Sequence, residues 1–119
     1  MGLNRRHPDS LLRELTEQLG LDYEPQDWGI ANANGERVEE FISFLDSHPL
    51  EATQRFELAG LILASMNERL LDAGEVDEVA LGHIVQVYRH EFEHHVSYWR
   101  GLTDNAEFPL GSVLRRAAI

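Results

Sequence analysis

The sequence contains no cysteine and no lysine. Without cysteine the chain has neither a disulfide framework nor a thiolate metal site, and this composition fits a reducing compartment. The longest apolar run, residues 58–66, is far shorter than the roughly 20 residues that cross a bilayer. The two arginines within residues 1–10 are followed by no apolar run, which argues against a secretory signal. We therefore expect a cytoplasmic protein.

Negative charge dominates the chain, because 21 acidic residues face ten arginines and the formal net charge is −11. Phosphates would repel such a chain, so nucleic acid is not an expected partner. The same repulsion applies to an anionic membrane surface. An acidic domain instead attracts basic partners and associates with them faster. The alternative is that the acidity serves only to keep the protein in solution.

Apolar periodicity predicts helices throughout a chain whose length suits one domain. The expected helices run from a cap at Asp9 or Ser10 to Gly20, over 35–46 with Asn34 as cap, from Pro49 to about Asp72, from Asp77 to Gly101, and over 110–118. No segment alternates as a strand does, so the predicted fold is all-α: an up-and-down bundle of four helices plus a short C-terminal helix. Residues 1–8 are expected to form a flexible N-terminal segment.

The third predicted helix is apolar on several faces, which places it at the centre of the fold. Gly60 within this helix is expected to permit the close approach of a neighbouring element. The fourth predicted helix is amphipathic, with one apolar stripe that runs from Leu81 to Trp99. At 100° per residue, His95 points toward that stripe, whereas His90 and His94 point away from it.

Residues 90–94, H-E-F-E-H, match the H-E-x-x-H pattern of zinc hydrolases. In those enzymes two histidines one helical turn apart bind the metal, and the glutamate activates water. Here the match would assign the metal to His90 and His94 and the base to Glu91. A small zinc-dependent hydrolase is therefore one alternative function.

Three features argue against catalysis at this motif. Glu93 occupies a position that is normally apolar, and only Asp104 and Glu107 follow as further candidate ligands. The two histidines also face away from the apolar stripe, on the strip that carries His83. We interpret the motif as a surface feature, with no catalytic residue, metal or cofactor assigned; an interaction site or adventitious metal site remains open.

A second constellation points to binding. Residues 22–51 carry eight acids and one arginine, and the acids of the second helix lie opposite its core stripe. Acidic residues around aromatic anchors fit a basic protein partner. The residues predicted to contact the partner are Asp22, Tyr23, Glu24, Asp27, Trp28, Glu36, Glu39, Glu40, Phe44 and Asp46. The alternative is a solvated amphipathic helix with Trp28 folded back onto the bundle.

The stretches V-E-E-F-I-S-F-L-D (38–46) and F-E-L-A-G-L-I-L-A-S-M-N-E-R-L (56–70) support a resemblance. With its size, its acidity and its lack of cysteine, the chain resembles the small helical immunity proteins of bacterial toxin systems, such as those of contact-dependent growth inhibition. The resemblance implies tight binding to a cognate toxin, often a nuclease with a basic active-site cleft, whose functional surface is then covered. A further alternative is a helical adaptor or a homodimer that closes an interface on the third helix.

Overall fold

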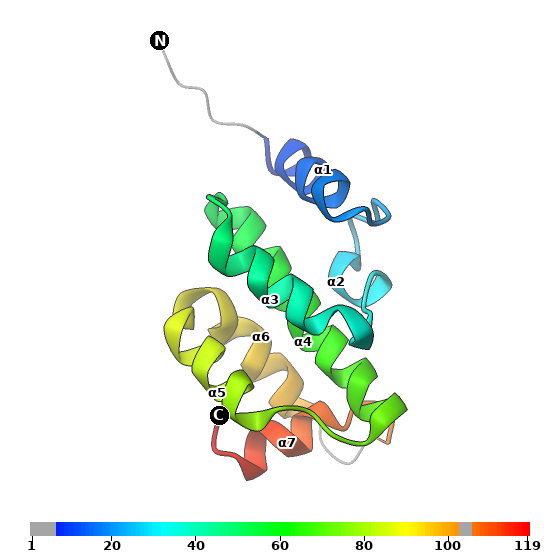
Figure 1. Cartoon of the computed structure of the whole chain (residues 1–119), viewed down its shortest axis with the longest axis vertical. Coiled ribbons are helices and arrows are strands. Elements are labelled where there is room, and N and C mark those ends of the chain that lie inside the picture. The colour runs from blue at the N-terminus through cyan, green and yellow to red at the C-terminus, as the bar shows by residue number, and fades with distance from the viewer. Residues whose placement is uncertain (1–6, 103–105) are drawn as a thin grey trace.

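The computed structural model describes residues 7–102 and 106–119, and these contain helices but no strand. The predicted all-α class is therefore confirmed. None of the helices in the described ranges is long and apolar enough to cross a membrane. The elements are α1 (Pro8–Leu19), α2 (Trp28–Ala31), the 3₁₀ helix η1 (Gly35–Arg37), α3 (Val38–Ser47), α4 (Ala52–Ala73), α5 (Glu78–Val87), α6 (Arg89–Gly101) and α7 (Leu110–Arg116) (Figure 1).

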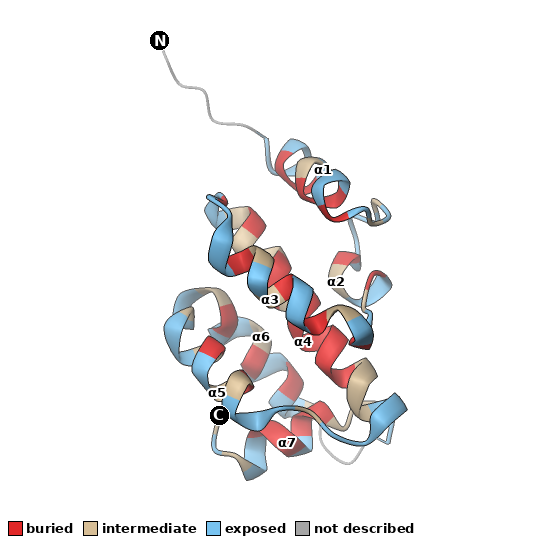
Figure 2. Ribbon diagram, in the orientation of Figure 1, coloured by how far each residue is buried: buried red, intermediate tan, exposed pale blue. Residues whose placement is uncertain are grey.

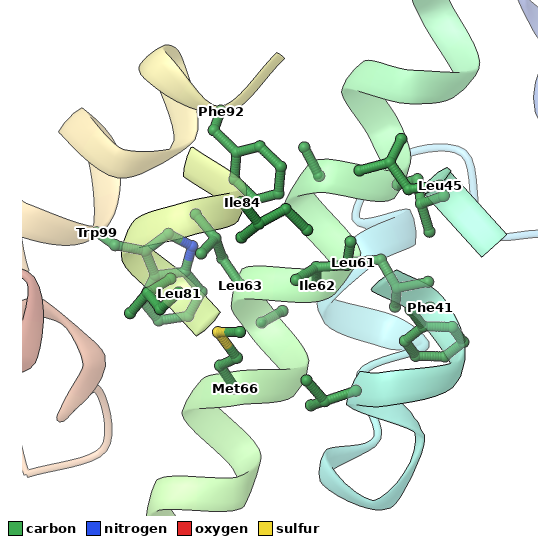
Figure 3. Packing of buried hydrophobic residues seen from close by; sticks show 14 of the residues in the cluster. Phe41, Leu45, Leu61, Ile62, Leu63, Met66, Leu81, Ile84, Phe92 and Trp99 are labelled. Carbon is green, nitrogen blue, oxygen red and sulfur yellow. The ribbon is translucent and has the colours of Figure 1, made fainter. Parts of the chain in front are cut away.

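Helix α4 is the central element, as its many apolar faces predicted. It packs against α1, α2, η1 and α3 and also against α6 and α7. Its buried residues lie between Gln54 and Asn67, and its last turn is exposed (Figure 2). In Figure 3, Phe41 and Leu45 of α3 approach it from one side, and Phe92 and Trp99 of α6 approach it from the other. The N-terminal and C-terminal elements thus share one core through α4.

Glycines allow the neighbouring elements to lie unusually close to α4. A methyl group added at Gly29 of α2 would lie 3.0 Å from the backbone nitrogen of Leu61, and one added at Gly35 of η1 would lie 2.8 Å from the backbone of Arg69. On α4 itself, a methyl group at Gly60 would lie 2.8 Å from the ring of His95. The predicted role of Gly60 in a close approach is confirmed, and the neighbour is α6.

The single helix predicted between Asp77 and Gly101 is wrong, because the chain turns at Tyr88 and forms α5 and α6. Tyr88 has φ −111° and ψ 47°, outside the helical region, and its hydroxyl donates a hydrogen bond to Asp46 of α3. This bond raises the pKa of Tyr88 to about 12. No glycine or proline marks the turn, so the local sequence contains no signal for the break, and the contact with Asp46 is made at that point. Figure 1 shows α6 leaving the turn in a different direction from α5.

Some predicted helix ends are confirmed, but α4 begins at Ala52 with Glu51 as its N-cap rather than at Pro49, and the helix predicted over 35–46 is η1 followed by α3. Gly20 and Gly74 end α1 and α4 with left-handed backbones, and the Asn34 side chain accepts a hydrogen bond from the Glu36 backbone N–H. The start of α1 differs: His7, rather than Asp9 or Ser10, is its N-cap. The segment expected to be flexible therefore contributes Pro8 to the first helix turn, and its residues 1–6 lie outside the described residues.

Candidate functional site: the α2–α6 groove and the acidic surface beside it

The predicted acidic surface is partly neutralised within the protein. Arg69 binds Glu39 through two hydrogen bonds, and Arg37 binds Glu40 in the same way. The hydrogen bonds from Arg69 lower the pKa of Glu39 to about 2, and those from Arg37 lower the pKa of Glu40. Asp46 accepts the Tyr88 hydroxyl. These three predicted contact residues therefore already have internal partners.

Four other predicted contact residues keep exposed carboxylates with no ion pair to any described residue: Asp22, Glu24, Asp27 and Glu36. They lie on the segment that joins α1 to α3, along one side of the molecule (Figure 1). The buried side chain of Asn32 holds this segment in place, because it accepts a hydrogen bond from the backbone N–H of Asp22 and donates to the Asp22 carbonyl. The free negative charge thus sits on an ordered surface.

Trp28 is not a surface anchor, contrary to the prediction. Its side chain is only 2% exposed, and its indole Nε1–H donates a hydrogen bond of 2.8 Å to the hydroxyl of Thr16 in α1. The folded-back alternative describes it correctly. Trp28 is buried because it belongs to α2, a four-residue helix that packs on α4. The polar composition of residues 21–34 did not indicate this helix.

The other two predicted aromatic contacts are half-buried and already stacked within the protein. The Arg13 guanidinium lies 3.9 Å from the centre of the Tyr23 ring, and the Phe44 ring stacks on His48 at 3.7 Å. Each ring therefore offers only part of its surface to a partner. The anchors of any interface must be sought elsewhere.

The H-E-x-x-H residues lie in α6, with His90 and His94 exposed as predicted. Glu91, the residue that would activate water, forms an ion pair of 3.1 Å with Arg55 of α4. Among the described residues, no group of three or more histidine or acidic side chains is arranged to hold a metal ion. Asp104, one of the two further candidate ligands, lies outside the described residues. His83, also exposed, is on α5 rather than on the same helix as the pair.

A groove lies between α2 and α6, with α4 as its floor. Its cavity volume is about 170 Å³, below the roughly 300–1,000 Å³ typical of small-molecule pockets. Ile30 and Tyr98 line it and are 54% and 53% exposed. Asp27 and Glu57 also line it, and no arginine within residues 7–102 and 106–119 does so. The groove therefore combines exposed apolar surface with carboxylates and no internal cation.

His95 occupies the α6 side of this groove in a fixed orientation. Its Nε2 lies 2.9 Å from the Phe56 carbonyl, which can only accept, so the neutral ring carries its proton on Nε2. Burial lowers the pKa of His95, and the ring is therefore uncharged at neutral pH. The predicted direction of His95, toward the apolar stripe, is confirmed by its partial burial. The unprotonated Nδ1 is left as an acceptor.

Glu57, the carboxylate that α4 contributes to the groove, is half-buried. Burial raises its pKa, and it forms no ion pair with a described residue. Removing a carboxylate from water without a compensating cation disfavours the charged form. Glu57 is thus a destabilising feature of the free protein at neutral pH.

The Glu57→Gln variant is expected to be more stable than the wild type at pH 7. The pKa of Glu57 is higher in the folded than in the unfolded wild-type protein, so the folded state binds the proton more tightly. The stability of the wild type therefore falls as the pH rises from the unfolded-state pKa through the folded-state pKa. Urea unfolding at pH 7 and at pH 4 checks this: the gain should be present at pH 7 and shrink at pH 4. An equal gain at both pH values would contradict the role of ionisation.

Sequence reasoning did not identify Ile30, Glu57 or Tyr98 as site residues. Glu57 stands in an otherwise apolar stretch of α4, which was the one available signal. The groove itself depends on how α2 and α6 meet across α4, and no local pattern reports that contact. Comparisons with protein-family models, with curated proteins and with solved structures gave no significant match to this chain.

Proposed function

We propose that the protein is a cytoplasmic binding protein that neutralises a cognate protein toxin by covering a basic functional surface, such as the cleft of a nuclease. The observation that carries this proposal is the excess of exposed, unpaired carboxylates on the segment between α1 and α3. Arg37 and Arg69 are engaged with Glu40 and Glu39, and no described arginine forms an ion pair with Asp22, Glu24 or Glu36. An ordered negative surface attracts a positively charged partner surface, speeds their association and forms ion pairs with it.

The bundle expected from the sequence, with the α5–α6 pair in place of its fourth helix, serves as the rigid support in this proposal. Polar cross-links fix the surface to α4: the Asn34 backbone N–H donates to the buried Ser65 hydroxyl, and Gln54 donates to the Leu11 carbonyl of α1. A preformed surface loses little conformational freedom on binding, which favours high affinity. The resemblance to helical immunity proteins agrees with this reading.

The test is reversal of the free charges. The triple variant Asp22→Lys, Glu24→Lys and Glu36→Lys should fold normally, because these side chains are exposed and have no ion pair among the described residues. Association with the cognate toxin should slow by about tenfold or more, and the effect should shrink as added salt screens the charges. Cells that produce the toxin should survive with the wild-type chain and die with the variant.

A matched control changes net charge equally at exposed acids elsewhere, with Asp72, Glu75 and Glu93 replaced by lysine. This control should still protect the cells and should associate faster than the first variant. Glu39 and Glu40 are left unchanged, since their reversal would break the pairs with Arg69 and Arg37 and confuse binding with stability. Equal protection by both triple variants would show that the segment between α1 and α3 is not the contact surface.

A further inference from the structure

We propose that the groove between α2 and α6 receives an arginine side chain of the partner protein, with its guanidinium between Glu57 and Asp27. The inference rests on the proposed function, because it assigns the anchoring contact of the same basic partner. It differs in location, since Glu57 and Tyr98 belong to α4 and α6, outside the surface predicted from the sequence.

The size of the groove fits a single side chain. A cavity volume of about 170 Å³ lies below the roughly 300–1,000 Å³ of typical small-molecule and cofactor pockets. Residues of α2 and of α6 line the groove together with Glu57 and Gly60 of α4, so an entering side chain has a wall on either side. Close packing of Gly29 on the α4 backbone and of the His95 ring on Gly60 fixes both walls. The shape is therefore set before a partner arrives.

The chemistry of the lining selects a cation with a flat, weakly hydrated head. Asp27 and Glu57 supply negative charge, and none of the described arginines lines the groove to compete for it. Tyr98 offers an exposed aromatic ring, and Ile30 offers apolar surface for the methylene stem. Guanidinium groups stack on aromatic rings and bind carboxylates bidentately, whereas an ammonium group is more strongly hydrated. Neutral His95 adds no opposing charge, and its Nδ1 is an acceptor.

The free protein also carries a cost that such an occupant would remove. Glu57 is half-buried, forms no ion pair with a described residue, and has a pKa that burial raises. A guanidinium beside Glu57 would form an ion pair with this carboxylate and so offset the free-energy cost of burying it. The groove combines exposed apolar surface with partly buried polar groups. Pockets that receive the anchoring side chains of protein partners have the same combination.

The test uses a defined probe, the peptide acetyl-Gly-Arg-Gly-amide, titrated into the ¹⁵N-labelled full chain. Amide shifts should be localised at Gly29, Gly60 and Tyr98, with a dissociation constant on the order of 10 mM or below. The same peptide with citrulline, which has the shape of arginine without the charge, should bind about tenfold more weakly. The lysine peptide should also bind more weakly, because its ammonium group stacks less well on Tyr98.

Glu57→Gln should lower the affinity for the arginine peptide by about tenfold and leave the circular dichroism spectrum of the protein unchanged. Glu68→Gln is the matched control: it lies on α4 about 16 Å along the helix axis from Glu57 and should leave binding unchanged. Shifts outside the groove, equal binding of the citrulline or lysine peptide, or no effect of Glu57→Gln would each overturn the proposal. The titration needs no toxin. The arginine-binding proposal can therefore fail while toxin neutralisation stands, and the peptide can bind even if the protein neutralises no toxin.

Discussion

Replacement of Trp28 by alanine is expected to lower the free energy of unfolding by about 3–5 kcal/mol, the range for a large aromatic side chain removed from a core. Trp28 is 2% exposed and joins α2 to α1 through the Thr16 hydroxyl, so the variant loses packing and a buried hydrogen bond together. Chemical denaturation followed by circular dichroism measures this loss. A surface anchor would instead leave stability almost unchanged and weaken only partner binding.

Trp28→Phe separates the two contributions. It keeps most of the aromatic surface and removes the Nε1–H donor, so it should cost less, with about 1 kcal/mol from the lost hydrogen bond. Its affinity for the partner should remain near that of the wild type. A Trp28→Ala variant that is as stable as the wild type would contradict the placement of α2 against α1 and α4.

Leu63→Ala is expected to lower the free energy of unfolding by about 2–5 kcal/mol, because Leu63 is fully buried at the centre of α4. Figure 3 places it between the side chains of Leu81 and Ile62. Truncation there removes apolar contacts and leaves a cavity that the surrounding helices can fill only in part.

Leu71→Ala provides the comparison on the same helix. Leu71 is 47% exposed, and its truncation is expected to change stability by less than about 1 kcal/mol. The same measurement, urea or guanidinium unfolding at pH 7, applies to both variants. Equal losses at the two positions would show that α4 is rotated relative to the core described here.

Local signals predicted most of the helices because they act within a few residues of one another. Gly20 and Gly74 end helices through left-handed backbones, and Asn34 caps through its own side chain. The uniform apolar character of α4 placed it centrally without knowledge of its neighbours. The helical period likewise placed His95 at the core edge and left His90 and His94 exposed.

Long-range contacts decided the features that the sequence did not predict. Tyr88 bonds to Asp46, 42 residues earlier, at the point where one expected helix becomes two. Trp28 finds its partner in Thr16, and the internal pairing of Glu39 depends on Arg69. An amphipathic pattern shows only that one side of a segment is apolar. It does not show which element covers that side.

The sequence by itself determined an all-α chain with an apolar central helix and a large excess of negative charge, since propensity, periodicity and composition are local or additive. The tertiary structure alone decided which carboxylates remain free. It left Asp22, Glu24 and Glu36 without an ion pair to any described residue and brought Asp27 and Glu57 into one groove beside Tyr98. Pairing and burial are properties of distance in space, and these distances arise only when α2 and α6 pack across α4.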